Sequence, residues 1–379
     1  MSIKSIIQSI LEKLFKPKFR LSDYEVVSVY TGDFNASSQL MGYQIWKHNV
    51  PDLWNETQGE GVKVAILDTG CQSSHPDLQG RIAFKYPGEA PDAVGHGTHV
   101  SGTVAASNNE IGFVGVAPKA DLYIIKVLND QGWGTLDDVA NGIYKAVEMG
   151  CDVISMSLGS PYTDPILHDA VKTAYNANIP IVCAAGNSGE IGALDYPGRY
   201  PETISIGALD KDNLRAAFSQ TGPLLDFMAP GVDIPSTYIT DAYAYLSGSS
   251  MSTPWVSGVI ALMIAKHRKL GGGTPVDTVE QIREHLKWTA IDLENFGKDD
   301  RTGYGLVDVK KAVEELKPDI IEEIPPIIVS AMMSNPPGHD KKNLYREWIQ
   351  FKNISNEPID MTDYVLKDLA GYLEQSVVN

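Results

Sequence analysis

Three side chains with the chemistry of a nucleophile, a base and a carboxylate stand beside short apolar runs of this 379-residue sequence. Asp68 ends the run VAILD, His96 lies in GHGTHVSGT, and Ser250 lies in GSSMSTP. A serine hydroxyl is a weak nucleophile and needs a base within hydrogen-bond reach, for which imidazole is the usual choice. A carboxylate orients the imidazole, and the chain order Asp, His, Ser is one known order of such a triad. These three residues are therefore the candidate catalytic group.

A fourth polar residue, Asn187, follows another apolar run, in VCAAGNSG. Its amide can donate a hydrogen bond to the charge that develops on a carbonyl oxygen during acyl transfer. The backbone N–H of Ser250 would be the second donor, because the first N–H groups of a helix have no partner within that helix. Gly-Asn-Ser-Gly is also a favourable turn sequence, so a purely structural Asn187 is the alternative.

The elements that must position these residues alternate between short β-rich runs and helical stretches. The runs are VKVAILDTG, DLYIIKVL, DVISMSLG, IPIVCAAGN and TISIGAL, and helices are predicted over 98–106, 136–149, 165–178 and 253–269, and within VDTVEQIREHLKWTA and VDVKKAVEEL. Such alternation predicts an α/β domain with a parallel sheet covered on both faces. In such sheets the functional site lies beyond the carboxyl ends of the strands, where Asp68 and Asn187 stand.

Four motifs, AILDTG, HGTHVSGT, AAGN and GSSMSTP, together resemble the motif set of the subtilisin-like serine proteases and occur in that family's order. The resemblance covers about residues 61–317 and implies a three-layer α/β fold with a parallel sheet. It also implies endopeptidase activity through an acyl-enzyme on Ser250, with Asp68 and His96 completing the triad and Asn187 in the oxyanion hole. Cys71, in LDTGC, makes the chain most similar to the intracellular subtilisins.

The same resemblance separates neighbouring residues of one type. It assigns the role of the base to His96 and leaves His99 as a structural residue of the helix. Ser249 stands where the family usually has Thr, Ser252 replaces a common Ala, and Trp255 replaces a common His. These departures border the site but remove no catalytic group.

The resemblance further implies a groove in which the substrate lies as an extra strand between two edge segments. The matching segments and pocket walls are Gly132, Trp133, Gly134, Ser157, Leu158, Gly159, Ser160, Ala184, Ala185 and Gly186. The base of the first specificity pocket corresponds to Asp195, in ALDYPGRYP. A carboxylate there would favour Lys or Arg in the substrate. A surface position for Asp195 with a broad apolar preference is the alternative.

Calcium is the metal that the resemblance implies. SHPDL and SNNEIGFVGVAP match the family's calcium loop, with side-chain oxygens expected from Asp77 and Asn109. Backbone carbonyls are expected from Ser107, Ile111 and Phe113, and hard oxygen ligands of this kind suit calcium. An ordinary Asn-rich turn is the alternative.

Composition shifts predict four segments: an N-terminal extension over 1–40, a catalytic domain over 41–317, a linker over 318–326 and a β domain over 327–379. The last segment resembles the start of a lamin-tail domain, an Ig-like β sandwich of which only part is present. Apolar residues within 3–15 follow a helical pattern that could pack on protein or lie on a membrane surface. The residues from Phe19 to Tyr24 faintly resemble the segment with which intracellular relatives block their own groove.

The formal charge of −17 makes nucleic acid an unfavourable partner and leaves protein or peptide substrates. Three sparse cysteines make a poor disulfide framework, and no secretory leader is recognised, so we expect a cytoplasmic location. Two other functions are compatible with the fold: an inactive binding protein and a serine esterase. The intact set of reactive residues argues against the first. The absence of a Gly-x-Ser-x-Gly elbow around Ser250 argues against the second.

Overall fold

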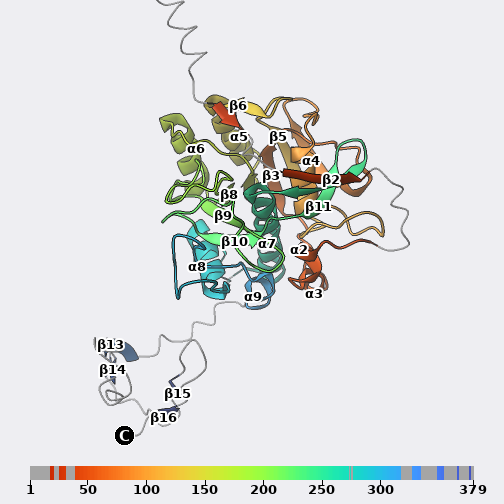
Figure 1. Cartoon of the computed structure of the whole chain (residues 1–379). Coiled ribbons are helices and arrows are strands. Elements are labelled where there is room, and N and C mark those ends of the chain that lie inside the picture. The colour runs from red at the N-terminus through yellow and green to blue at the C-terminus, as the bar shows by residue number, and fades with distance from the viewer. Residues whose placement is uncertain are drawn as a thin grey trace, which may run out of the picture. The chain divides into compact units, whose positions relative to one another are not determined.

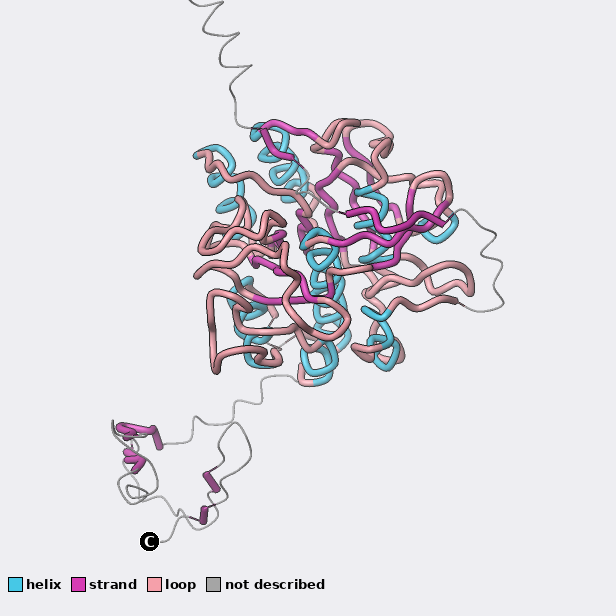
Figure 2. Tube along the Cα trace, viewed as in Figure 1, coloured by secondary structure: helices cyan, strands magenta, loops and turns pink. Residues whose placement is uncertain are grey.

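The computed structural model describes residues 18–20, 25–30, 39–272, 274 and 276–316, and four short strands beyond residue 326 (Figures 1 and 2). The chain divides into two compact units, Met1–Pro318 and Asp319–Asn379. The helical pattern within residues 3–15, the extension from 21 to 24 and the linker lie outside the described residues. No described helix is long and apolar enough to cross a membrane.

A seven-stranded, entirely parallel sheet forms the centre of the first unit, as the alternation of apolar runs and helices predicts. Its strand order is β10-β9-β8-β7-β3-β5-β4. The strands are β3 (Lys63–Asp68), β4 (Ile82–Tyr86), β5 (Asp121–Lys126), β7 (Val153–Met156), β8 (Ile181–Ala184), β9 (Ile204–Leu209) and β10 (Phe227–Pro230). Because β7 lies between β3 and β8, the residues that follow these three strands meet at one edge of the sheet.

Helices cover both faces of this sheet and make it the middle of three layers (Figure 1). Alternate residues of β3 show the two faces: Val64 and Ile66 pack in the core with α4 (His96–Ala105) and α7 (Ser249–Lys269). Ala65 and Leu67 pack in a second core with α5 (Leu136–Glu148) and α6 (Pro165–Asn176). The other described helices are α2 (Tyr43–Trp46), α3 (Val50–Leu53), α8 (Val279–Thr289) and α9 (Val309–Glu314), with a 3-10 turn at Pro76–Leu78.

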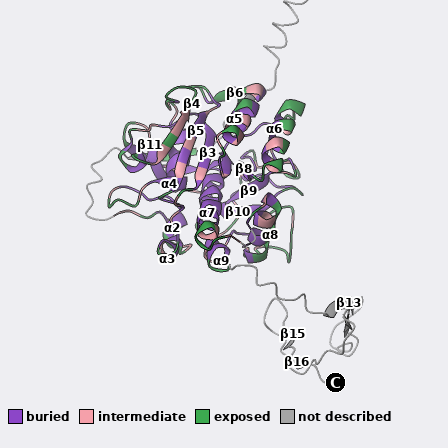
Figure 3. Cartoon of the chain, turned by 180° about the vertical axis from the view of Figure 1, so that it is seen from behind, coloured by how far each residue is buried: buried purple, intermediate pink, exposed green. Residues whose placement is uncertain are grey.

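Helix α7 runs through the core and is buried over most of its length (Figure 3). It begins at Ser249, four residues before the predicted start at residue 253. Pro254 lies inside the helix. Proline has no N–H to bond the carbonyl four residues earlier, and the Ser157 hydroxyl donates to that Ser250 carbonyl oxygen instead, at 2.8 Å. The helix can therefore include Ser250 in its first turn.

Two smaller sheets pair strands of the N-terminal segment with strands from the rest of the first unit. Strand β1 (Lys18–Arg20) pairs antiparallel with β6 (Trp133–Thr135), with Phe19 opposite Gly134. Strand β2 (Glu25–Tyr30) pairs antiparallel with β12 (Ala242–Ser247), which also pairs with β11 (Ile234–Tyr238). In the second unit, β13 (Ile327–Met333) pairs with β14 (Trp348–Asn353), and β15 (Val365–Leu366) pairs with β16 (Gln375–Ser376).

Candidate active site

Strand β3 and helix α4 bring Asp68 and His96 together. Asp68 is the last residue of β3 and His96 is the first residue of α4, and both side chains are fully buried. Asp68 Oδ1 lies 2.8 Å from Nδ1 of His96 and accepts a second hydrogen bond, of 2.7 Å, from the backbone N–H of Thr69. An acceptor at Nδ1 places a proton on that nitrogen, so the neutral imidazole presents Nε2 as its basic atom.

Ser250 stands in the first turn of α7, against the residue that follows β7. Its hydroxyl lies 3.3 Å from the backbone carbonyl oxygen of Ser157, while the Ser157 hydroxyl bonds the Ser250 carbonyl. This reciprocal contact between neighbours in the core attaches the start of α7 to the carboxyl end of β7. Since β7 lies beside β3, Ser250 and Asp68 belong to the same edge of the sheet.

Asn187 follows β8 and is oriented by Ser249. Its Oδ1 accepts hydrogen bonds from the backbone N–H of Ser249 at 2.8 Å and from the Ser249 hydroxyl at 2.7 Å. A backbone N–H can only donate, so the side of the amide that faces Ser249 is the oxygen. The donor group, Nδ2, is therefore directed away from Ser249. The Ser249 hydroxyl also accepts from the N–H of Gly186, at 3.2 Å.

The unusual neighbours of Ser250 direct their polar atoms into the core. Ser252 donates to the Ala229 carbonyl at 3.0 Å, and the Trp255 indole donates to the Gln44 carbonyl at 2.7 Å. His99 is fully buried, and its Nε2 lies within 3.1 Å of the Ile234 and Ala244 carbonyl oxygens. Burial lowers the pKa of His99 to about 3, so this imidazole is neutral at any ordinary pH.

The predicted substrate-binding residues lie in three separate segments of the structure. Gly134 and Trp133 belong to β6 and Gly132 precedes it. The segment 157–160 follows β7, and the segment 184–186 ends and follows β8. The edge strand β6 already carries β1 as an antiparallel partner, so this edge pairs with a strand in the way expected for a substrate.

Asp195 lies between the two predicted pocket walls. A Cβ placed on Gly159 would come within 2.9 Å of Asp195 Oδ2, and one placed on Gly186 would come within 3.0 Å. Gln220, which the sequence reasoning did not single out, donates to Asp195 Oδ1 at 3.4 Å. Burial raises the pKa of the Asp195 carboxyl, the Gln220 hydrogen bond opposes the rise, and nearby Glu190 adds to it. Glycine at 159 and 186 thus allows the Asp195 and Gln220 side chains to approach the backbone closely.

The predicted calcium residues surround the turn that follows α4. Asp77 is fully buried, and its Oδ2 accepts from the Tyr243 hydroxyl at 2.7 Å and from the Phe113 N–H at 3.2 Å. Its Oδ1 is buried without a hydrogen-bond partner. Burial raises the Asp77 pKa to about 6, and the hydrogen bonds from Tyr243 and Phe113 oppose the rise. A buried carboxylate oxygen without a donor beside amide and carbonyl oxygens is a donor set that fits calcium.

Gln39 belongs to this cluster, and the sequence reasoning missed it. Its Nε2 donates to the Ser107 carbonyl at 3.1 Å and to the Ile111 carbonyl at 2.6 Å. Its Oε1 accepts from the N–H groups of Asn109 and Glu110. Two predicted ligand carbonyls thus converge on one polar side chain. Within the described residues, no three His, Cys, Asp or Glu side chains cluster to hold a metal, so any site here depends on amide and carbonyl oxygens.

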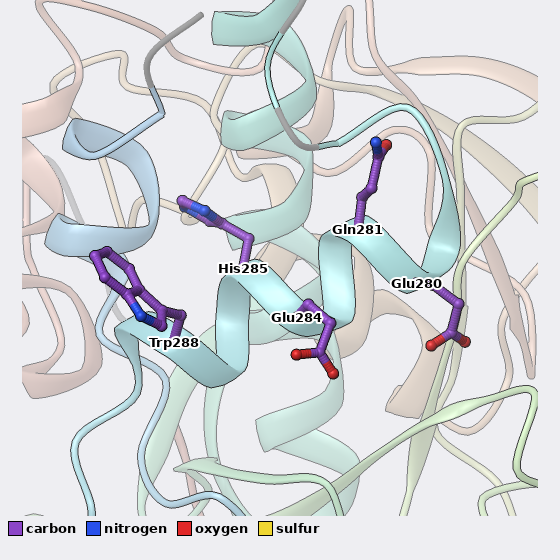
Figure 4. Close-up of a pocket in the computed structure, with 5 residues that line it drawn as sticks. All are labelled: Glu280, Gln281, Glu284, His285 and Trp288. Carbon is purple, nitrogen blue, oxygen red and sulfur yellow. The ribbon is translucent and has the colours of Figure 1, made fainter. Parts of the chain in front are cut away.

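A pocket of about 430 Å³ lies on α8, away from these residues, and no part of it was predicted. Figure 4 shows the Glu280 and Glu284 carboxylates pointing away from the imidazole of His285. The ring nitrogen Nε2 of His285 lies 2.9 Å from the Ala312 carbonyl of α9, which gives that histidine a packing role. The pocket is lined by Glu280, Gln281, Glu284, His285 and Trp288.

All three cysteines are unpaired and buried, in agreement with the expectation that they form no disulfide framework. Burial raises the pKa values of Cys71 and Cys151 to about 12 and raises that of Cys183 as well. A thiol of such high pKa is a poor nucleophile at neutral pH, so none of the three competes with Ser250 for that role.

Comparison with known proteins gives one consistent result. A family model described as the subtilase family matches residues 59–305, a range that contains Asp68, His96, Asn187 and Ser250. The chain is 50% identical over 226 residues to an intracellular serine protease of Paenibacillus polymyxa, covering 56% of this chain and 69% of that protein. It is 46% identical over 257 residues to Subtilisin Savinase of Lederbergia lenta, covering 67% and 91%. It is 42% identical over 288 residues to Subtilisin E of Bacillus subtilis (strain 168), covering 73% and 72%.

Proposed function

The chain belongs to the subtilase family and is a serine endopeptidase, and from this premise we propose that Asp68, His96 and Ser250 form its catalytic triad, with Asn187 as an oxyanion donor. The observation that carries the proposal is the 2.8 Å contact between Asp68 Oδ1 and His96 Nδ1 at the sheet edge where Ser157 and Asn187 hold the start of α7. The shared sheet edge of β3, β7 and β8 supports the grouping of these four residues in one site.

The mechanism follows from these positions. His96 Nε2 takes the proton from Ser250 Oγ as that oxygen forms a bond to the substrate carbonyl carbon. Asn187 Nδ2 and the Ser250 N–H stabilise the resulting oxyanion, and Asp68 stabilises the imidazolium. His96 then gives its proton to the leaving amine, the C–N bond breaks, and an acyl-enzyme remains on Ser250. Water, deprotonated by His96, attacks the acyl carbon, and the proton returns to Ser250 as the acid product leaves.

A serine-directed fluorophosphonate tests this assignment. We expect it to label the wild-type protein at Ser250, while Ser250→Ala and His96→Ala give no labelling and no digestion of a protein substrate. Labelling that persists in Ser250→Ala would overturn the assignment. An unlabelled wild type would indicate a binding protein, and ester hydrolysis without peptide hydrolysis would indicate an esterase.

Substrates with Lys or Arg before the cleaved bond are the proposed preference of the first pocket. The half-buried Asp195 carboxylate beside Gly159 and Gly186 supports this proposal, because a charge-assisted hydrogen bond is stronger than one between neutral groups. Matched Lys and Leu peptides provide the measurement, with Asp195→Asn as the isosteric control. We expect that variant to lower the Lys-to-Leu ratio of kcat/KM by about 10- to 100-fold, which corresponds to a hydrogen bond to a charged group. Equal rates for both peptides in the wild type would refute the preference.

Calcium is the proposed structural metal, held by Asp77 and Asn109 with the carbonyls of Ser107, Ile111 and Phe113. The buried Asp77 oxygen without a hydrogen-bond partner supports it, and Gln39 Nε2 holds two of these carbonyls together by donating to Ser107 and Ile111. A bound calcium ion would supply positive charge that offsets the Asp77 carboxylate. The residues themselves fasten the turn after α4 to the N-terminal segment and to Tyr243 of β12.

The N-terminal extension is proposed to inhibit the enzyme until it is removed. The pairing of β1 with β6 supports this, since β1 takes the edge that an extended substrate would need. Full-length Ser250→Ala protein, which lacks the nucleophile, can be added to a trimmed active enzyme. This mixture separates two events: cleavage of the extension by the active enzyme, and occupancy of the substrate groove by the extension. We expect a trimmed chain to be more active than the full-length chain, and mass spectrometry over time to place the first cuts before residue 39. Equal activity of the two forms would contradict the proposal.

Two further proposals concern the context in which the enzyme works. A cytoplasmic location is supported by the three buried, unpaired cysteines and by the relative that is named an intracellular serine protease.

The strands from β13 to β16 are proposed to belong to a lamin-tail-like module that binds or targets and takes no part in catalysis. Deleting residues 319–379 should then leave kcat on peptides unchanged, whereas a fall in kcat would argue for a catalytic contribution.

A further inference from the structure

Asp92, in the loop before α4, gathers an unusual number of hydrogen bonds for one carboxylate. Its Oδ1 accepts from the Thr69 hydroxyl and from the N–H groups of Val94 and Gly95, each at 2.9 Å. Its Oδ2 accepts from the N–H of Thr98 at 2.9 Å and from the Thr98 hydroxyl at 2.7 Å. Asp92 touches neither Asp68 nor His96 in these bonds, yet every partner lies within three residues of one of them.

The Thr69 hydroxyl connects this carboxylate to both members of the Asp–His pair. It donates to Asp92 and accepts from the N–H of Gly97, the residue after His96, at 2.9 Å. The N–H of the same Thr69 donates to the Asp68 carboxylate at 2.7 Å. The residue that follows Asp68 and the residue that follows His96 are therefore joined through one hydroxyl, and Asp92 fixes the orientation of that hydroxyl.

Helix α4 depends on this arrangement because its own N-cap residue cannot supply it. Gly95 has no side chain to accept from the first N–H groups, and those of Gly97 and Thr98 bond Thr69 and Asp92 instead. A larger residue at 95 is excluded: its φ is +96°, and a Cβ would lie 2.3 Å from the Tyr238 ring. Asp92 therefore caps the helix in place of the N-cap residue. It also bonds Thr69, the residue that follows β3.

We propose that Asp92 is a positioning residue for the reaction, and that through Thr69 it sets the register between Asp68 at the end of β3 and His96 at the start of α4. The inference rests on the proposed triad. Removing the carboxylate would release both Thr69 and the first turn of α4, and the Asp–His contact would loosen. A misplacement of about 1 Å in such a group lowers turnover by roughly 100-fold.

Asp299 provides a matched control far along the chain. Its carboxylate accepts four hydrogen bonds, from the N–H groups of Asn295, Arg301 and Thr302 and from the Thr302 hydroxyl. Like Asp92, it holds a loop through a threonine that donates both its N–H and its hydroxyl. Asp92→Ala and Asp299→Ala therefore lose similar bonding, and both should lower the Tm.

The experiment measures kcat, KM and Tm of purified full-chain variants on one peptide substrate. We expect Asp92→Ala to lower kcat by about 10- to 100-fold with KM changed less than about twofold, since substrate contacts remain. Asp299→Ala should keep the wild-type kcat. Thr69→Val should lower kcat in the same sense, and Thr69→Ser, which keeps the hydroxyl, should restore it. The Thr69 pair replaces Asp92→Ala if that variant does not fold.

The outcomes separate this inference from the triad itself. If His96→Ala abolishes activity while Asp92→Ala and Thr69→Val keep the wild-type kcat, the positioning role is refuted and the triad stands. A kcat that falls equally in Asp92→Ala and Asp299→Ala would also refute it, because the effect would be one of general stability. Activity retained in His96→Ala would refute the triad and the inference together.

Discussion

At the scale of single residues, the orientation of one amide decides whether the oxyanion hole can work. In the proposed oxyanion hole Asn187 presents Nδ2 to the substrate, and the two donors that Ser249 gives to Oδ1 favour this orientation. Serine at 249 in place of the family's usual threonine keeps the hydroxyl that matters. The departure seen in the sequence is thus compatible with the same amide orientation.

We therefore predict that Ser249→Ala lowers kcat by about 10-fold, because the amide keeps one of its two fixing bonds and a fully lost oxyanion donor costs more than this. Ser249→Thr should retain the wild-type kcat. Ser252→Ala is the neighbouring control, since the Ser252 hydroxyl bonds Ala229. The measurement is kcat on a single peptide substrate, and equal values for Ser249→Ala and Ser252→Ala would show that the hydroxyl does not orient Asn187.

At the scale of elements, the start of α7 depends on a proline and a serine that act together. Pro254 leaves the Ser250 carbonyl without a helical donor, and the Ser157 hydroxyl from the end of β7 replaces it. Ser157→Ala should therefore lower the free energy of unfolding by about 1–3 kcal/mol, because a buried acceptor loses its partner.

The double variant provides the sharper test of this pairing. Pro254→Ala restores an N–H four residues after Ser250, so Ser157→Ala should be less destabilising when combined with it. Urea unfolding of the four proteins in the cycle measures the coupling, for which we expect about 1 kcal/mol. Strict additivity of the two single changes would contradict the compensation.

The turn after α4 should respond to pH and to metal in a linked way. Burial raises the Asp77 pKa to about 6, so in the absence of metal the folded state binds a proton that the unfolded state has released. Stability in chelator should then fall as pH rises from about 4 to 6 and stay low above that range. Calcium should oppose the fall, with a larger increase in Tm at pH 7 than at pH 5. An equal increase in Tm with calcium at both pH values would count against the site. So would the absence of any increase in both Asp77→Asn and the wild type.

The elements also show where sequence reasoning succeeds and where it stops. Asp68 and Asn187 could be placed because each follows an apolar run, and parallel strands end at one edge. Helix α7 starts earlier than predicted, because the tertiary contact between the Ser157 hydroxyl and the Ser250 carbonyl compensates for the N–H that Pro254 lacks. Gln39 was missed because it acts on a loop about seventy residues away, and no local pattern records that contact. The network around Asp92 was missed although most of its bonds are local, because its link to β3 runs through Thr69, 23 residues earlier in the chain.

At the scale of the whole molecule, the N-terminal segment makes two sets of contacts that a truncation can separate. Strands β1 and β2 pair with β6 and β12, whereas Gln39 and Leu40 hold the turn after α4, with the Leu40 N–H bonding the Gly112 carbonyl at 2.8 Å. If the extension inhibits the enzyme as proposed, the inhibitory part ends just before Gln39, where the contacts with the turn after α4 begin.

We predict that a chain beginning at Gln39 is more active than the full chain and remains stabilised by calcium. A chain beginning at Gly42 should be as active at low temperature but lose the calcium effect on Tm, which should be roughly 5 °C at a saturating concentration near 100 times Kd. Melting curves of both chains with calcium and with chelator make the comparison. Identical responses would show that Gln39 takes no part in the site.

The pairing of β2 with β12 has a consequence for the lifetime of the trimmed enzyme. Strand β12 is the middle of a three-stranded sheet, and removal of β2 leaves its residues Ala242–Ser247 as a sheet edge. An uncovered edge with open N–H and C=O groups is a template for self-association. The cut that releases the groove would therefore also expose a surface prone to aggregation, which ends three residues before Ser250. Activation and gradual removal from solution would then follow from the same event.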